Sequence, residues 1–173
     1  MPGPVFIAGD GIDLHTVEES DLPFLHRIIN DPAVWRDLFT ATPKRMADEE
    51  AWYETLADDG ETHLLICDDG DPVGIVGLSG IDPSWGVAEL GYFVDPDAHG
   101  QGYATEAVTH IVEYAFDQRR LAKLYANALA TNQGSRRVLE KNGFVEEGRF
   151  RAHAFIDGER VDVIRYGRLA AER

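Results

Sequence analysis

The chain is poor in basic residues, and above all in lysine. It has 16 Lys and Arg residues against 31 Asp and Glu residues, for a net charge of -15, and only 3 of the 16 are lysines. Sequence-independent nucleic-acid binding neutralises phosphates with Lys and Arg, and a surface this negative repels a polyanion. The composition therefore argues against a nucleic-acid partner. Any small anion must be held locally, by backbone N–H groups or a few arginines.

Cysteine and long apolar runs are also scarce. Cys67 is the single cysteine, so an internal disulfide and a zinc-finger pattern are both excluded. The N-terminal residues lack a basic segment followed by a long apolar run, and no stretch approaches the roughly 20 apolar residues of a membrane span. We therefore expect a cytoplasmic protein without a membrane partner.

The remaining composition is that of a globular domain. Of the 173 residues 44% are hydrophobic, and no repeat or low-complexity linker interrupts the chain, so we expect one domain over residues 1–173. The acidic excess, with 17 Asp and 14 Glu, is typical of a halophile, in which carboxylates keep proteins hydrated at high salt. An acidic surface in ordinary salt, from a GC-rich genome, is the alternative.

Changes in hydrophobic periodicity predict both helices and strands. In the first half we expect a helix over 22–29 capped by Ser20-Asp21, a helix over 48–57, and a hairpin turning at 68–72. In the second half we expect a strand over 86–94, a helix over 103–118, a strand over 123–129, a helix over 132–141 and a hairpin over 144–169 that turns at Asp157-Gly158. The strand–helix–strand over 86–129 forms a βαβ unit with parallel strands.

The loop between the strand over 86–94 and the next helix contains Gly100-Gln101-Gly102. Unpaired N–H groups and the positive end of the helix dipole meet there, and glycines let a phosphate approach the backbone. A plain turn that uses glycine for its φ angles is the alternative. The chain lacks the Gly-Lys-Ser/Thr of a P-loop, and Thr105 replaces the third glycine of a dinucleotide fingerprint.

Metal binding is not expected. The acidic turn at 68–72 lacks the ligand spacing and flanking helices of a calcium loop. His110 and Glu113 share a helix face but have no further ligands nearby in the sequence.

Four segments of the second half occur in an order and spacing that is specific in combination. They are Glu89-Leu-Gly-Tyr-Phe-Val94, His99-Gly-Gln-Gly-Tyr-Ala-Thr-Glu-Ala107, Asn132-Gln-Gly-Ser135 and Glu140-Lys-Asn-Gly-Phe144. Together they resemble the acetyl-CoA-binding core of the GNAT superfamily of N-acetyltransferases, in its RimJ/RimL-like branch. The resemblance places this core at residues 86–144. The resemblance implies a mixed α/β fold of about seven mostly antiparallel strands and about four helices, with a central parallel pair splayed for acetyl-CoA.

The resemblance also implies how the cosubstrate binds. The pantetheine arm would pair with the backbone of Phe93 and Val94, and Asn132 would hydrogen-bond the arm from the start of the last helix. The pyrophosphate would lie on the glycine loop, whose members are His99, Gly100, Gln101, Gly102, Tyr103, Ala104 and Thr105. Arg136, Arg137 or Lys141 offer local positive charge.

For catalysis the resemblance points to Glu89 and Ser135. Glu89 shares a strand face with Gly91 and Phe93, near the family's reacting thioester, and is the first choice of base; a purely structural carboxylate is the alternative. Many superfamily members use a Tyr seven residues after the Asn as the acid, but this chain has Leu139 there. Ser135 would then bond the sulfur, or merely cap the helix. Trp35 and Phe39 follow the first helix, where the family binds its acceptor.

The predicted function is acetyl transfer to a primary amine by direct transfer in a ternary complex. The acceptor would be a protein N-terminus, as the branch implies, or a small molecule such as a polyamine, amino acid or antibiotic. A non-catalytic acyl-CoA-binding module is the rival from another class. The tail strands permit either a monomer or a homodimer.

Overall fold

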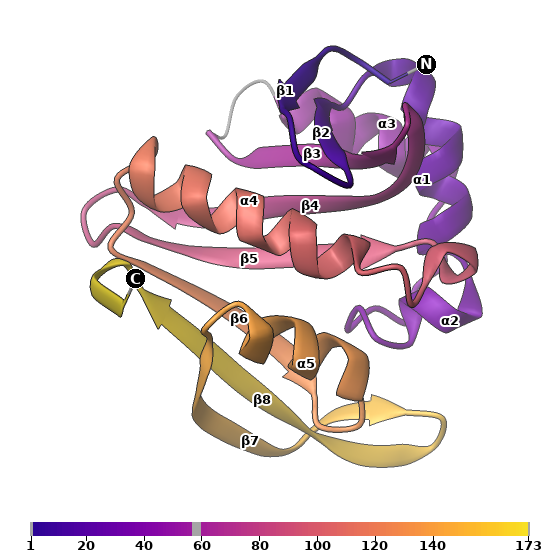
Figure 1. Ribbon diagram of the computed structural model, residues 1–173. Coiled ribbons are helices and arrows are strands. Elements are labelled where there is room, and N and C mark those ends of the chain that lie inside the picture. Colours follow the sequence, from indigo (N-terminus) through magenta and orange to yellow (C-terminus); the bar gives the residue numbers. More distant parts are fainter. Residues whose placement is uncertain (1, 57–59, 173) are drawn as a thin grey trace.

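The computed structural model describes residues 2–56 and 60–172 and contains one eight-stranded sheet (Figure 1). Its strand order is β1-β2-β3-β4-β5-β6-β8-β7. The strands are β1 (Val5–Ile7), β2 (Asp13–Thr16), β3 (Thr62–Asp68), β4 (Asp71–Asp82), β5 (Val87–Val94), β6 (Lys123–Leu129), β7 (Val145–Ile156) and β8 (Glu159–Leu169). The α-helices are α1 (Leu22–Ile29), α2 (Pro32–Trp35), α3 (Met46–Thr55), α4 (Tyr103–Asp117) and α5 (Gln133–Lys141). Three short 3-10 helices cover Glu19–Asp21, Pro96–Ala98 and Ala170–Glu172.

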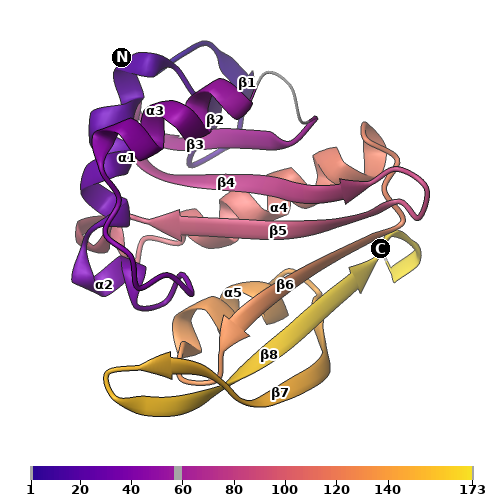
Figure 2. The same cartoon turned by 180° about the vertical axis from the view of Figure 1, so that it is seen from behind.

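All neighbouring strands are antiparallel except β5 and β6, which run parallel and are joined by α4. The predicted βαβ unit is therefore confirmed. The pairing of β5 with β6 is short: it joins Val87 to Lys123, Ala88 to Leu124 and Glu89 to Tyr125, and then stops. Beyond Glu89 the two strands separate, as Figure 2 shows from behind. The predicted splay of the parallel pair is thus present.

The sheet has an apolar cluster on each face because its central strands are buried on both sides. Successive side chains of a strand point to opposite faces, so Leu64 and Ile66 join the cluster under α4 and α5, while Leu65 and Cys67 join the cluster under α1 and α3. Figures 1 and 2 show these helix pairs on opposite faces.

The predicted bounds of α1, 22–29, are confirmed but its side-chain cap is not, and α3 begins two residues before the predicted start at residue 48. Asp21 does not cap α1; its carboxylate accepts a hydrogen bond from the Glu18 backbone N–H (2.8 Å), so it closes the preceding 3-10 turn. Asp48 likewise accepts from the Arg45 N–H (2.8 Å) from the third position of α3, which begins at Met46. In each case the aspartate reaches back from inside the turn. The predicted end of the second helix, Ala57, lies outside the described residues.

In the described part of the chain the structure has one strand and one α-helix more than expected, and both additional elements are short. The four-residue α2 begins at Pro32 after Asp31, whose side chain accepts from the Ala33 N–H (2.8 Å). The three-residue β1 pairs irregularly with β2. Elements this short carry too little periodicity to be recognised in a sequence. The predicted turn of the last hairpin is confirmed, with positive φ at Asp157 (49°) and Gly158 (84°).

Candidate active site

A cleft of about 860 Å³ opens where β5 separates from β6. Because it is bordered by the N-terminal ends of α4 and α5, we call it the helix-side cleft. Of the predicted cosubstrate-binding residues, all but Gln101 line it: Phe93, Val94, His99, Gly100, Gly102, Tyr103, Ala104, Thr105, Asn132 and Ser135. The fold therefore brings the two motif loops and the strand edge together around one space.

The glycine loop presents bare backbone to this cleft. Gly100 and Gly102 have φ of 81° and 89°, which side-chain-bearing residues rarely adopt, and no atom lies within 4 Å of a Cβ built on either. Gly102 is the N-cap of α4, so the unpaired N–H groups of the first helical turn face an anion site with the favourable end of the dipole. His99 is bound to the Val94 carbonyl through Nε2 (3.0 Å), which ties the loop to the end of β5.

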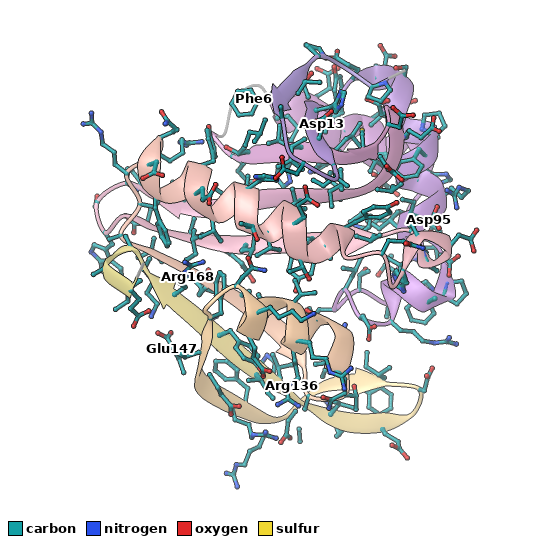
Figure 3. The ribbon with its side chains drawn as sticks, in the orientation of Figure 1. Phe6, Asp13, Asp95, Arg136, Glu147 and Arg168 are labelled. Carbon is teal, nitrogen blue, oxygen red and sulfur yellow. The ribbon has the colours of Figure 1, made fainter. Side chains whose placement is uncertain are left out.

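Basic residues on α5 divide between the cleft and the core. Arg137 and Lys141 line the helix-side cleft and supply positive charge near the loop. Arg136 does not line it; its Nε donates to the Tyr166 hydroxyl (3.0 Å) and its Nη1 to the Ala130 carbonyl (3.3 Å). Figure 3 shows Arg136 beneath α5, toward β8. Arg136 therefore lies outside the cleft, and of the three basic residues offered as alternatives for local positive charge, Arg137 and Lys141 line it.

An ion pair also fixes the loop to a helix on the opposite face of the sheet. The Arg27 Nη2 on α1 donates to the Asp95 Oδ2 at 2.5 Å, and Asp95 stands at the start of the loop between β5 and α4 (Figure 3). Burial acts to raise the pKa of the Asp95 carboxyl, but the hydrogen bonds from Arg27 and from the Asp97 N–H outweigh it and hold this pKa below its usual range.

At the start of α5, Asn132 and Ser135 have the predicted capping geometry and one contact that the sequence did not predict. The Asn132 Oδ1 accepts from the Ser135 N–H (2.9 Å), which leaves the Asn132 amide nitrogen for a ligand. The Ser135 Oγ is hydrogen-bonded to the Tyr92 hydroxyl (2.9 Å), which also contacts the Ser135 carbonyl (3.1 Å). Burial raises the pKa of Tyr92 to about 12, so this hydroxyl keeps its proton at neutral pH. Leu139 is fully buried.

Glu89 stands at the point where β5 and β6 part. Its Oε1 accepts from the Asn127 Nδ2 on β6 (2.9 Å), and the Asn127 Oδ1 accepts from the Arg165 Nε on β8 (3.2 Å). Burial raises the pKa of Tyr125, the strand partner of Glu89, and the nearby Glu89 carboxylate adds to that rise. Glu89 is thus oriented by an amide, and among the described residues no Arg or Lys pairs directly with it.

A second cleft, of about 790 Å³, meets the first at this carboxylate. It is lined by aromatic residues of α2, of the loop after α2 and of the last hairpin, so we call it the hairpin-side cleft; they are Trp35, Phe39, Phe150 and Phe155. Phe39, Glu89 and Asn127 border both clefts. The β5–β6 gap therefore connects the cleft that contains the glycine loop with a cleft lined by aromatic side chains, and Glu89 borders both.

Sequence reasoning missed Asn127, Arg165 and the Tyr92 contact. Asn127 was within reach, because two-residue alternation places it on the same β6 face as Tyr125. Arg165 lies 38 residues after Asn127, and only the β6–β8 register, which pairs these two residues directly, brings them together.

Two negative findings concern the described residues alone. Within residues 2–56 and 60–172, no group of three or more His, Cys, Asp or Glu side chains is arranged to hold a metal ion. No helix in the same part of the chain is long and apolar enough to cross a membrane.

Comparisons with known proteins agree with this geometry. Residues 12–145 match the acetyltransferase (GNAT) domain family. YdaF of Bacillus subtilis (strain 168), which bears the provisional name of a ribosomal N-acetyltransferase, is 28% identical over 169 residues, covering 93% of this chain and 92% of its own. The spermidine N(1)-acetyltransferase of Escherichia coli (strain K12) is 28% identical over 155 residues, covering 89% of this chain and 83% of its own. The crystal structure of a spermidine N-acetyltransferase from Vibrio cholerae with CoA and spermine superposes with a TM-score of 0.89 at 26% identity, covering 95% of this chain and 98% of that one.

Proposed function

This chain belongs to the GNAT acetyltransferase family, and we propose that it acetylates the α-amine of a protein N-terminus of the ribosomal-protein kind. It is an N-acetyltransferase whose cosubstrate is acetyl-CoA. The observation that carries the proposal is the position of Glu89, a carboxylate at the junction of two clefts, one suited to an anionic cosubstrate and the other to an acceptor.

The helix-side cleft fits acetyl-CoA in three respects, and we assign the core to residues 86–144. The glycine loop offers N–H groups for a pyrophosphate, helped by Arg137 and Lys141. Among the described residues no strand pairs with the gap-facing edge of β5 after Glu89, so a pantetheine amide can pair there as an added strand would, at Phe93 and at Val94 once His99 releases the Val94 carbonyl. The Asn132 amide nitrogen, at the N-terminal end of α5, can donate a hydrogen bond to the pantetheine arm.

The chemistry follows from the residues at the junction. Acetyl-CoA, when bound, supplies an acetyl thioester. Glu89 takes a proton from the acceptor ammonium, directly or through an ordered water, so that a neutral amine attacks the acetyl carbon as the carbon–sulfur bond breaks. Ser135, hydrogen-bonded to the Tyr92 hydroxyl, gives its hydroxyl proton to the departing thiolate sulfur and regains a proton from the new amide nitrogen, which loses its second proton as the carbon–nitrogen bond forms.

Transfer is direct, without an acylated enzyme. The only thiol in the chain is that of Cys67, which is fully buried in β3. Burial raises its pKa to about 12, so the thiolate that a covalent route requires is not formed at neutral pH.

A polyamine is the second candidate acceptor. Two observations favour it: relatives of similar identity are named spermidine acetyltransferases, and a net charge of -15 attracts polycations. A module that binds acyl-CoA without turnover is the third.

One assay separates the three. The protein is incubated with acetyl-CoA and, in turn, with ribosomal-protein N-terminal peptides, spermidine, amino acids and aminoglycosides, while CoA release and the mass of the amine are followed. We expect acetyl-CoA-dependent mass gain on the peptide α-amine. Faster acetylation of spermidine would transfer the assignment to polyamines. Tight CoA binding with no product from any amine would identify a binding module.

A further inference from the structure

The charges that line the hairpin-side cleft differ from those of the protein as a whole. Although the chain carries a net charge of -15, the carboxylates that line this cleft within the described part of the chain are only Glu89 and Asp157. Asp157 pairs with the Arg36 Nε at 3.2 Å. His153 and Arg165 line the same space. The cleft therefore offers one carboxylate without a basic partner, together with a permanent cation.

The Arg165 guanidinium is fixed by its neighbours, and its Nη groups are left without hydrogen-bond partners among the described residues. Its Nε donates to Asn127, and its guanidinium carbon lies 4.4 Å from the centre of the Tyr125 ring and 5.5 Å from that of Phe150. These contacts fix the plane of the guanidinium. Among the described residues the two Nη groups have no hydrogen-bond partner, and Arg165 is only half-buried. Four N–H donors therefore remain for a ligand in the cleft.

The side chain of Asn127 sets the distance between the Arg165 guanidinium and the Glu89 carboxylate. Asn127 bridges them, donating to Glu89 with its nitrogen and accepting from Arg165 with its oxygen. A group that places an amine at Glu89 and an oxygen acceptor at Arg165 must carry both within a few bonds. The α-amine and the adjacent carbonyl of a peptide N-terminus have this arrangement. A polyamine has no acceptor oxygen, and its second ammonium would approach the Arg165 cation.

We infer that Arg165 binds the carbonyl or carboxylate oxygen next to the reacting amine, and so selects α-amino acyl acceptors over polyamines. The inference rests on the proposed acetyl transfer and adds the residue that chooses the acceptor. The aromatic wall of Trp35, Phe39, Phe150 and Phe155 lies beside the same point and suits an apolar first side chain.

The test uses two amines that differ in one group. Phenylalanine amide and phenethylamine share the ring and the primary amine, but only the first has a carbonyl. The kcat/KM for each is measured with the wild type, with Arg165→Met and with Arg151→Met, which removes an exposed β7 arginine that lines neither cleft. The ratio compared is kcat/KM for phenylalanine amide divided by kcat/KM for phenethylamine. We expect Arg165→Met to lower this ratio about tenfold or more, because a charge-assisted hydrogen bond to the carbonyl is lost. Arg151→Met should leave the ratio unchanged.

The ratio distinguishes direct binding of the acceptor carbonyl by Arg165 from an indirect role in which Arg165 only orients Glu89 through Asn127. Because Arg165 also orients Asn127, its loss will slow both reactions; an equal slowing of both amines would overturn the inference. Arg165→Lys, which keeps the charge, serves as the second variant if Arg165→Met does not fold, and should retain part of the ratio. Wild-type acetylation of spermidine above that of phenylalanine amide would overturn the inference and leave acetyl transfer standing. Absence of any acetylated amine would overturn both.

Discussion

The two clefts that meet at Glu89 are built in different ways. The helix-side cleft contains the bare backbone of the glycine loop, together with side chains from residues 33–39, β5, β6 and α5. The hairpin-side cleft is lined by side chains from α2, the loop that follows it and the last hairpin, four of which are aromatic. A site made of main chain tolerates changes of side chain, whereas a site made of side chains changes with each substitution.

This difference explains how one fold carries different acceptors. The two sequence relatives named above are each 28% identical to this chain, yet one is named a ribosomal N-acetyltransferase and the other a spermidine N(1)-acetyltransferase. We expect the cosubstrate side to be the common part, because backbone amides recognise the anion whatever the neighbouring residues. Four predictions test this contrast, from the largest expected effect to the smallest.

Gly102→Asp should weaken CoA binding at least about 100-fold, because it adds a carboxylate beside the phosphates and disturbs the amides that bind them. Isothermal titration with CoA measures the effect. Gly70→Asp is the matched control, since Gly70 has a φ of 85° and open space around its Cβ but stands in the β3–β4 turn. Equal CoA affinity in Gly102→Asp and the wild type would show that the loop does not hold the anion.

Glu89→Gln should lower kcat about 100-fold, because the amide cannot accept the proton of the acceptor ammonium, while CoA affinity stays at the wild-type value. Steady-state rates and titration on the same preparation give both quantities. Glu113→Gln removes an exposed carboxylate of α4 and controls for the change in net charge. A parallel loss of CoA affinity would mean that Glu89 belongs to the cosubstrate side and that the two clefts are not separate in function.

Tyr92→Phe isolates a titration that belongs to the helix-side cleft. The pKa of Tyr92 is raised to about 12 in the folded protein, against about 10 when unfolded. Its contribution to the free energy of unfolding is therefore complete below pH 10 and is lost as the pH rises toward 12, by about 2 kcal/mol. Urea unfolding between pH 8 and 12 should show this decline in the wild type and less of it in the variant. Parallel curves would mean that Tyr92 is not buried as described.

Arg27→Met should have the smallest effect, a loss of at most about 0.5 kcal/mol in the free energy of unfolding, because the side chain of Arg27 is 56% exposed. The low pKa of Asp95 means that the pair contributes above about pH 4 and that its contribution disappears as the pH falls through the folded pKa. Thermal unfolding at pH 7 and pH 3 should thus show a larger difference between variant and wild type at pH 7 than at pH 3. A larger effect on CoA affinity would identify Arg27 as a support of the glycine loop.

The sequence was informative wherever function depends on local backbone. The βαβ unit and the glycine loop were predicted because residue type and position within a few residues fix them. The side-chain cap of α1 and the start of α3 were missed because Asp21 and Asp48 accept hydrogen bonds from backbone N–H groups that precede them, a choice that composition alone does not reveal. The exclusion of Arg136 from the cleft depends on Tyr166, which reaches it from β8.

The sequence by itself determined the family, the mixed sheet and the helix-side cleft, because periodicity, glycine positions and helix ends are local properties of the chain. Only the tertiary structure decided which residues surround the acceptor. The register of β8 against β6 brings Arg165 to Asn127 and so to Glu89, and the last hairpin brings Phe150 and Phe155 opposite Trp35. Those contacts depend on how strands far apart in sequence align, and no local pattern records that alignment.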